Sequence, residues 1–365
     1  MEKNEILVIY GDNPQTMTES IAETACLKDI IGDKNKRIGI KPNLVVSASA
    51  DNGATTHPEI VRGLIAYLRK NGFNNIAIME GAWVGDNTDR AFKVCGYEKL
   101  AKESGAELIN LQKDKARPHN CSGMEIEICE SALKVDFMIN IPVLKGHCQT
   151  LLTCALKNNK GVIPDREKRR FHSLGLHKPI AHLNTVAKND FIIVDSICGD
   201  LDFEEGGNPV FAGRIFAARD PVLCDAWSAT LLGYRIDEIP YIGLAEKLGI
   251  GSADLAKAVI REINRSSQGA LFTRPQGKIR ELSKFIKEDK ACSACYASLI
   301  FALSKMRDSE RHLLKDAVCI GQGFKGKNGK TGVGLCTSAF AVYCEGCPPN
   351  TNDILNFLRT LCAAH

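Results

Sequence analysis

The sequence lacks several signatures that would place it in a common functional class. It has no phosphate-loop motif, and its first 285 residues contain no Gly-x-Gly-x-x-Gly, so we expect neither a Walker site nor a standard dinucleotide site. The net charge is only +4, and the densest basic run, residues 166–170, is short and interrupted, which argues against nucleic acid as a partner. The apolar stretch Ile6–Tyr10 is too short for a signal peptide or a membrane span. We therefore expect a cytoplasmic protein with no membrane partner.

Cysteine, by contrast, is abundant. The chain has 15 cysteines, and seven of them lie between Cys292 and Cys362. In a reducing compartment, clustered cysteines bind metal more often than they form disulfides. The C-terminal part is therefore expected to hold a metal centre.

The larger, N-terminal part alternates between strand and helix patterns. Its helices are best represented by the amphipathic segment Pro58–Asn71, which is followed by Gly72. Short apolar runs bounded by polar residues predict strands buried on both faces. The predicted strands are Ile6–Tyr10, Arg37–Ile40, Ile76–Glu80, Glu107–Leu111, Phe137–Ile141, Phe191–Asp195 and Arg214–Ala218. This alternation predicts an α/β fold, with a mostly parallel sheet and helices on both faces.

We divide the chain into an α/β domain, residues 1–285, and a small cysteine-rich iron–sulfur domain, residues 286–365. Residues 272–290 are expected to be a linker or a connecting helix. Beyond them we predict a helix over Cys292–Met306, a strand over Ala317–Ile320, a loop over Gly321–Gly334 and a closing helix over Asn352–Leu361.

Two Cys-x-x-Cys pairs carry the metal prediction: Cys292 with Cys295, and Cys344 with Cys347. Zinc and iron–sulfur sites both use such pairs. Iron–sulfur is favoured because Gly346 lets the backbone approach a cluster and Pro348-Pro349 stiffens the exit from Cys347. Six cysteines lie from Cys292 to Cys347, and four thiolates on one zinc ion would leave two of these six without a use.

The order of these motifs resembles the proximal cluster site of hydrogenase small subunits. The resemblance implies one [4Fe–4S] cluster, with Cys292, Cys295 and Cys347 as ligands. For the remaining ligand we prefer Cys336, which follows Gly334-Leu335, while Cys319 and Cys344 stay as alternatives.

Polar segments near the predicted strand ends form a second candidate site. Ligands of open parallel sheets bind beyond the carboxyl ends of the strands. We call this the rim site and assign its anion-binding role to Lys41, Asn43, Lys145, Lys157, Asn158 and Lys160. His57 and His147 are the candidates for proton transfer, because histidine exchanges protons near neutral pH.

The segments also occur in a characteristic order. Lys41-Pro42-Asn43, Thr56-His57-Pro58-Glu59, Glu80-Gly81, Pro142 to His147, Ala155 to Gly161 and Arg219-Asp220-Pro221 together resemble the domain-of-unknown-function three-hundred-and-sixty-two family, over roughly residues 5–265. Members of that family often carry iron–sulfur cysteines, and the family name carries no settled reaction. A weaker likeness, taken as analogy, links the Thr-His and Lys-Gly-His segments to nickel-pincer lactate racemases.

We therefore interpret the chain as an iron–sulfur redox protein of an oxygen-poor environment. Electrons would pass through the cluster to a small anionic ligand or a redox protein partner at the α/β domain, and a homodimer is compatible with the sequence. The residues leave open whether the protein is an enzyme; an iron–sulfur oxidoreductase is the enzyme they would support. The alternatives are a non-redox isomerase or racemase with a structural cluster, and an accessory protein that delivers electrons or metal to a larger anaerobic enzyme.

Overall fold

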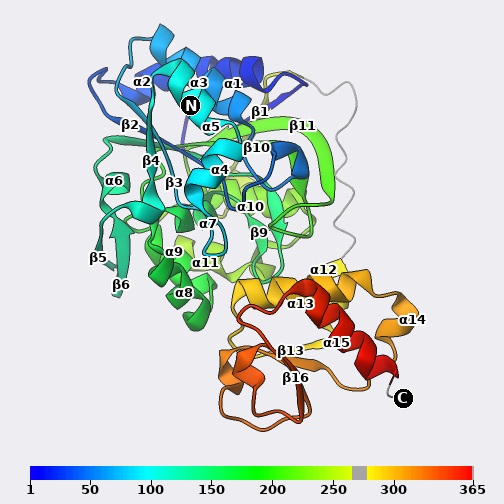
Figure 1. Ribbon diagram of the computed structural model, residues 1–365. Helices are drawn as coiled ribbons and strands as arrows, with labels where there is room; N and C mark the ends of the chain where they lie inside the picture. Colours follow the sequence, from blue (N-terminus) through cyan, green and yellow to red (C-terminus); the bar gives the residue numbers. More distant parts are fainter. Residues whose placement is uncertain (265–277, 364–365) are drawn as a thin grey trace. The chain divides into compact units, whose positions relative to one another are not determined.

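The computed structural model describes residues 1–264 and 278–363 (Figure 1). These residues fall into two units: residues 1–168 with 177–264, and residues 169–176 with 278–363. Helix α12 (Lys278–Ser283) belongs to the second unit, although it precedes the boundary that we placed at residue 285. The linker expected from residue 272 lies partly outside the described residues.

The first unit is built on one sheet with the strand order β12-β1-β11-β10-β7-β2-β3-β4. Neighbouring strands are parallel except where β11 pairs with β1 and β10, so the sheet is mostly parallel, as predicted. Its strands are β1 (Glu5–Tyr10), β2 (Ile38–Pro42), β3 (Ile76–Glu80), β4 (Glu107–Asn110), β7 (Phe137–Ile141), β10 (Phe191–Asp200), β11 (Pro209–Ala218) and β12 (Val259–Glu262). Each of the seven predicted strands corresponds to one of these, and β10 and β11 are longer than expected.

Helices cover both faces of this sheet (Figure 1). Alternate strand residues such as Leu7 and Ile9 pack on one side against α1 to α5, and Ile6 and Val8 face the other side. On that side Phe216 of β11 packs edge-to-face on Trp227 of α10. The helices of the region are α1 (Pro14–Thr24), α2 (Leu27–Ile31), α3 (Pro58–Lys70), α4 (Thr88–Val94), α5 (Tyr97–Ser104), α6 (Glu130–Leu133), α7 (Ala155–Asn158), α8 (Asp165–Leu174), α9 (His177–Leu183), α10 (Pro221–Leu231) and α11 (Pro240–Lys247).

Two short antiparallel ribbons were not predicted. Strands β5 (Ala116–Cys121) and β6 (Met124–Cys129) meet at Ser122 and Gly123, which both have positive φ, as two-residue hairpin turns require. Strands β8 (Lys145–His147) and β9 (Leu151–Thr153) form the second ribbon. The Lys-Gly-His segment, expected in a loop, is therefore a strand.

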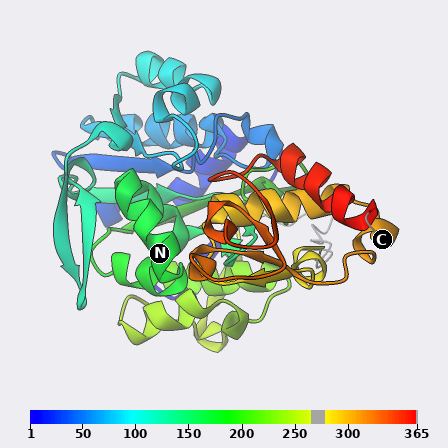
Figure 2. The same cartoon turned by 60° about the horizontal axis from the view of Figure 1, so that its bottom comes forward.

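The second unit contains a parallel sheet with the order β13-β14-β15-β16. Its strands are β13 (Ile286–Glu288), β14 (Val318–Ile320), β15 (Thr331–Val333) and β16 (Val342–Cys344), and its helices are α12, α13 (Ser293–Lys305), α14 (Asp308–Arg311) and α15 (Thr351–Ala363). Helices α13 and α15 lie side by side in both views (Figures 1 and 2). Buried Leu299, Leu303, Ile320, Ile354 and Leu358 form the apolar interior of the unit.

One expectation for this part needs correction. The segment predicted as a loop, Gly321–Gly334, contains strand β15. It also begins with Gly321-Gln-Gly-Phe-Lys-Gly326, which has the Gly-x-Gly-x-x-Gly spacing but opens a single 3₁₀ turn at Gln322–Phe324. That motif binds pyrophosphate at the N-terminus of a helix, and no such helix follows here. Among the described helices, none is long and apolar enough to cross a membrane.

Candidate functional site

Four cysteines gather in the second unit: Cys292, Cys295, Cys336 and Cys347. Burial is the main cause that raises the pKa of the first three thiols, to about 12 for Cys295. The electrostatic influence of Cys347 raises the pKa of each of these three thiols further, so the four side chains lie near one another. These are the four residues that the sequence predicted as cluster ligands.

The other two candidates have different surroundings. After burial, the charges that act on Cys319 are those of Lys287 and Asp316, and the charge that acts on Cys344 is that of Asp353. None of the four gathered thiols is among these influences. Cys336, unlike Cys319 and Cys344, is therefore among the thiols that influence one another electrostatically.

Local structure explains how distant cysteines meet. Cys292 is the N-cap of α13 and Cys295 lies in its first turn, where the helix dipole favours a thiolate. The segments of Cys336 and Cys347 are joined because Leu335 N donates to Gly346 O at 3.0 Å. Gly346 has a φ of 133°, and a Cβ there would lie 2.4 Å from Pro349 Cα, so only glycine suits the position.

The rim site of the first unit centres on Glu204, a residue that we did not predict. Its Oε2 lies 2.8 Å from His147 Nε2 and 3.0 Å from Lys157 Nζ. Its backbone carbonyl accepts a hydrogen bond of 2.8 Å from Lys145 Nζ. Burial would raise the pKa of Glu204, but the charges of His147, Lys157 and Lys160 hold that pKa well below its usual range.

Glycine and aspartate bring these residues together. A Cβ on Gly146 would lie 2.1 Å from Leu201 O, so glycine between Lys145 and His147 is what lets β8 touch the loop after β10. Asp200, at the end of β10, accepts N–H hydrogen bonds of 2.9 Å from residues 202, 203 and 208. This carboxylate folds the loop so that Glu204 returns to β8.

Lys41 lies at the same strand ends but has its own partner. It belongs to β2, is fully buried and forms an ion pair with Glu80 of β3. Gly161 packs directly on this pair, since a Cβ there would lie 2.6 Å from Lys41 Nζ. Two lysines of the rim site are therefore already paired with carboxylates: Lys41 with Glu80, and Lys157 with Glu204.

Two asparagines connect the parts of the rim site. Asn43 Nδ2 donates to Asn158 Oδ1 at 2.9 Å, and Lys145 Nζ donates to Asn43 Oδ1 at 3.3 Å. Asn158 and Lys157 lie on α7, whose first turn is held by Asp225: its carboxylate accepts from Ala155 N at 2.7 Å. The structure therefore brings Lys41, Asn43, Lys145, His147, Lys157, Asn158 and Lys160 into one network.

Lys145 is the lysine of this network whose side chain is held by neutral acceptors. Its Nζ donates to Asn43 Oδ1 and to the carbonyls of Ala54 and Glu204. Burial, only partly offset by Glu204, lowers the pKa of Lys145 to about 7. Burial and the neighbouring charge of Lys157 also lower the pKa of the half-buried Lys160 to about 7. Both lysines can therefore change charge near neutral pH.

The two predicted histidines differ. His147 Nδ1 accepts from the N–H groups of Gln149 and Thr150, so its proton lies on Nε2 and points at Glu204. Burial lowers the pKa of His147 to about 4. The expected proton exchange near neutral pH therefore fits Lys145 better than His147.

His57 lies outside the lysine network. Its Nδ1 is 2.8 Å from Asp195 Oδ2, and its backbone N–H donates to the same oxygen. Burial would lower the pKa of His57, but Asp195 and then Asp51 raise it above the usual value. His57 remains a candidate for proton transfer, with Asp195 as the residue that orients it.

Another buried group joins Cys154, Cys224 and Asp225. One ligand atom from each of these three residues lies within 4.8 Å of the other two. Among the described residues, this is the group of at least three His, Cys, Asp or Glu side chains that meets this distance. Cys154 Sγ is 3.9 Å from Cys224 Sγ, and both side chains are fully buried, as is common for cysteines that act as small apolar residues. Because Asp225 holds the start of α7, the group supports the rim site.

Comparisons with known proteins give the family of the first unit. A sequence model of the family described as Domain of unknown function (DUF362) matches residues 38–230, more than half of the chain. The polar segments from Lys41 to Pro221 lie inside this range, which confirms the family resemblance drawn from their order. Residues 278–363, which hold the clustered cysteines, lie outside it.

Two individual proteins are similar to this chain. The thylakoid-associated protein sll1697 of Synechocystis sp. is 22% identical over 230 residues, which cover 59% of this chain and 68% of that protein. Among solved structures, the lactate racemase apoprotein from Thermoanaerobacterium thermosaccharolyticum matches 66% of the chain at 13% identity, with a TM-score of 0.40. This match spans 59% of that protein's length, less than two thirds.

Proposed function

For this chain, which belongs to the DUF362 family, we propose the function of an iron–sulfur redox protein whose first unit binds a small anion. The family description assigns no reaction, so the support comes from the residues of the chain itself. The gathering of Cys292, Cys295, Cys336 and Cys347, apart from Cys319 and Cys344, is the observation that carries the proposal.

The four thiols supply the ligand set of one [4Fe–4S] cluster, which takes four cysteine thiolates. A zinc site can use the same number of thiolates, so the preference for iron rests on the sequence. Gly346 lets the backbone approach a cluster, Pro348-Pro349 stiffens the exit from Cys347, and the order of the motifs resembles a known cluster site.

The chain contributes more than ligands. Gln322 Nε2 donates to Cys292 Sγ at 3.2 Å, and hydrogen bonds to ligand sulfurs are one way in which proteins set the potential of a cluster. Cys347 is exposed, which puts one ligand at the protein surface. When bound, the cluster would supply one-electron transfer, and the exposed side offers the place for a redox protein partner.

In the first unit, Lys145 and Lys160 would hold the anion. Glu80 and Glu204 already neutralise Lys41 and Lys157, whereas Lys145 is held by neutral acceptors. An anion beside Lys145 would restore its positive charge, so binding would be accompanied by proton uptake. Electron transfer to a ligand bound there would then be supplied with a proton from the same lysine.

One observation favours a second candidate, a non-redox isomerase or racemase with a structural cluster. A lysine with a pKa of about 7 is suited to act as a general base, and Lys145 is such a lysine. In this case turnover would not depend on a reductant.

Anaerobic purification tests the redox proposal. The protein should be brown and contain about four irons and four sulfides per chain. Electron paramagnetic resonance of the reduced protein should show a cluster signal, and mass analysis should reveal any small anion that is purified with it. Stoichiometric zinc without sulfide would refute the proposal.

A further inference from the structure

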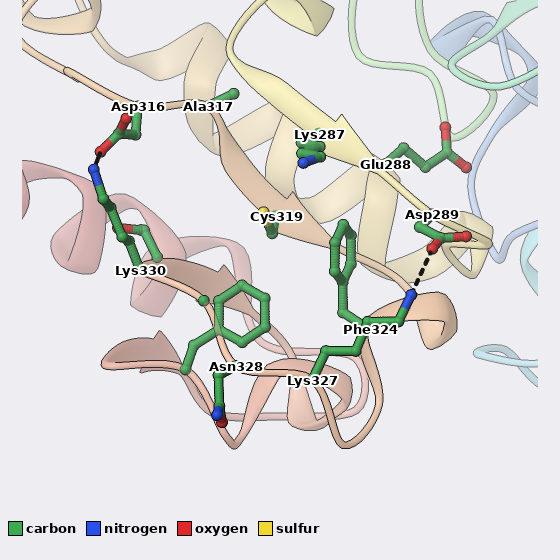
Figure 3. Close-up of a pocket in the computed structure, with 13 residues that line it drawn as sticks. Lys287, Glu288, Asp289, Asp316, Ala317, Cys319, Phe324, Lys327, Asn328 and Lys330 are labelled. Carbon is green, nitrogen blue, oxygen red and sulfur yellow. Dashed lines mark hydrogen bonds and ion pairs between the residues drawn. The ribbon is translucent and has the colours of Figure 1, made fainter.

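The second unit contains a cavity of about 660 Å³ that none of the assignments above uses (Figure 3). It lies between strands β13 and β14 and the segment Phe324–Thr331. Its volume is in the range of small-molecule sites, which is roughly 300–1,000 Å³. The question is which chemistry its walls would recognise.

The β-sheet side of the cavity combines a cation with a thiol. Lys287 of β13 and Cys319 of β14 are register partners in a parallel pair, so their side chains lie next to each other on one face of the sheet. Figure 3 shows both on the side of the cavity. The Cys319 thiol is partly exposed, so it can report on what occupies the space.

The opposite wall is apolar and aromatic. The rings of Phe324 and Phe340 meet edge-to-face, with centroids 5.7 Å apart and planes at 84°. The loop lies flat on Phe340 because residue 329 is glycine: a Cβ there would lie 2.3 Å from the ring. This pair offers ring faces and edges to an apolar group.

Three lysines and three carboxylates line the cavity, and two of these lysines are paired with two of the carboxylates. The third carboxylate, Glu288, follows Lys287 along β13 and points away from it (Figure 3). Lys330 Nζ lies 3.1 Å from Asp316 and Lys327 Nζ lies 3.6 Å from Asp289, and these pairs tie the loop to the strands. Lys287, by contrast, has no ion pair with a carboxylate in the part of the chain that the structure describes. A ligand with one negative group would complete the set.

We propose that this cavity binds a small organic anion with an aromatic or other apolar body. Its anionic group pairs with Lys287, and its apolar part packs on Phe324 and Phe340. The site is separate from the rim site, which belongs to the first unit. It does not depend on the presence of a cluster.

Protection of Cys319 from alkylation tests this site in the intact protein. Benzoate is the probe, and the modification of the Cys319 peptide by iodoacetamide is followed by mass spectrometry. Benzoate should slow the modification in a saturable way, whereas acetate, which lacks the ring, and benzyl alcohol, which lacks the charge, should protect far less. Equal protection by all three compounds, or none by benzoate, would overturn the proposal.

A substitution of Lys287 tests whether this side chain supplies the positive charge that binds benzoate. Lys287→Gln should raise the benzoate concentration needed for half-protection about tenfold, the scale of one charge-assisted hydrogen bond. Lys305→Gln, on the exposed side of α13, should leave it unchanged. Unchanged protection in Lys287→Gln contradicts the assignment. If Lys287→Gln does not fold, the comparison of the three compounds in the natural protein still tests the proposal. The iron content, measured in parallel, reports separately on the cluster.

Discussion

Replacing Lys145 by alanine should weaken the binding of a small anion at the rim site and reduce the pH dependence of that binding. The Lys145 side chain is 1% exposed and donates to Asn43 Oδ1 and to two backbone carbonyls. To offer a charge-assisted hydrogen bond to a ligand, Lys145 must be protonated, and one of its three N–H groups must exchange its present acceptor for the anion. Such a bond contributes about 1.5–3 kcal/mol, so the dissociation constant at pH 6 should rise about 10- to 150-fold.

The direction of the pH effect follows from the lowered pKa of Lys145, about 7 instead of 10.5. Below pH 7 the lysine is charged in the free protein and binds an anion directly. Above pH 7 a proton must be taken up on binding, which weakens the affinity about tenfold for each pH unit. Lys145 alone should therefore make the natural protein bind sulfate or acetate about tenfold more weakly at pH 8 than at pH 6, and the titration of Lys160 adds to this loss.

Calorimetric titration measures both effects. Sulfate and acetate keep the same charge between pH 6 and 8, and two buffers of different ionisation enthalpy count the protons taken up. Lys99→Ala is the control, because that side chain is 78% exposed on α5. Unaltered affinity in Lys145→Ala, or equal affinity of the natural protein at both pH values, would refute the reasoning, and iron content should be the same in all three proteins.

Three further changes probe the rest of the account. Cys292→Ser or Cys347→Ser should loosen the second unit and leave the first folded, because metal binding contributes much of the folding free energy of small cysteine-rich units. Limited proteolysis should then remove residues beyond about 290. Unfolding of the whole chain would contradict this expectation. Gln322→Leu should lower the reduction potential of the cluster by about 40 mV, the equivalent of one hydrogen bond of about 1 kcal/mol, in a redox titration. Glu204→Gln should lower the free energy of unfolding in urea by about 3–5 kcal/mol, since Lys157 would be left buried without its carboxylate; a loss below 1 kcal/mol would remove Glu204 from the centre of the site.

The sheet could be predicted from the sequence because its strands are short apolar runs with polar ends. Ile76–Glu80 and Phe137–Ile141 were predicted with the bounds that the structure has, since both are buried on two faces. The extension of β10 to Asp200 was missed, because its second half contains Ser196, Gly199 and Asp200, which resemble a loop.

The rim site was predicted in part. The position after a predicted strand was enough to identify Lys41 and Lys145. It did not identify the residues from other segments that pack against them. Glu204 reaches His147 only through the loop that Asp200 folds, and nothing local to Glu204 indicates that contact. An acidic pair followed by Gly206-Gly207, just beyond a strand, was the available signal.

The choice of Cys336 illustrates the same limit. Spacing alone could not separate it from Cys319: Cys319 lies near the end of the predicted strand Ala317–Ile320, and Cys336 follows the segment Gly321–Gly334 that was predicted as a loop. The difference arises from the pairing of β14, β15 and β16, which joins the Cys336 segment to that of Cys347 and leaves Cys319 beside Lys287. Such long-range pairing is not encoded in any single motif.

The iron content of six single cysteine-to-serine variants, purified without oxygen, tests the central claim most directly. The variants replace Cys292, Cys295, Cys319, Cys336, Cys344 and Cys347. A cluster on the four gathered thiols predicts that the variants of Cys292, Cys295, Cys336 and Cys347 lose most of their iron and sulfide, while those of Cys319 and Cys344 keep about four of each. Full iron in the Cys336 variant together with its loss in the Cys319 or Cys344 variant would contradict the assignment, and zinc in place of iron throughout would contradict the function.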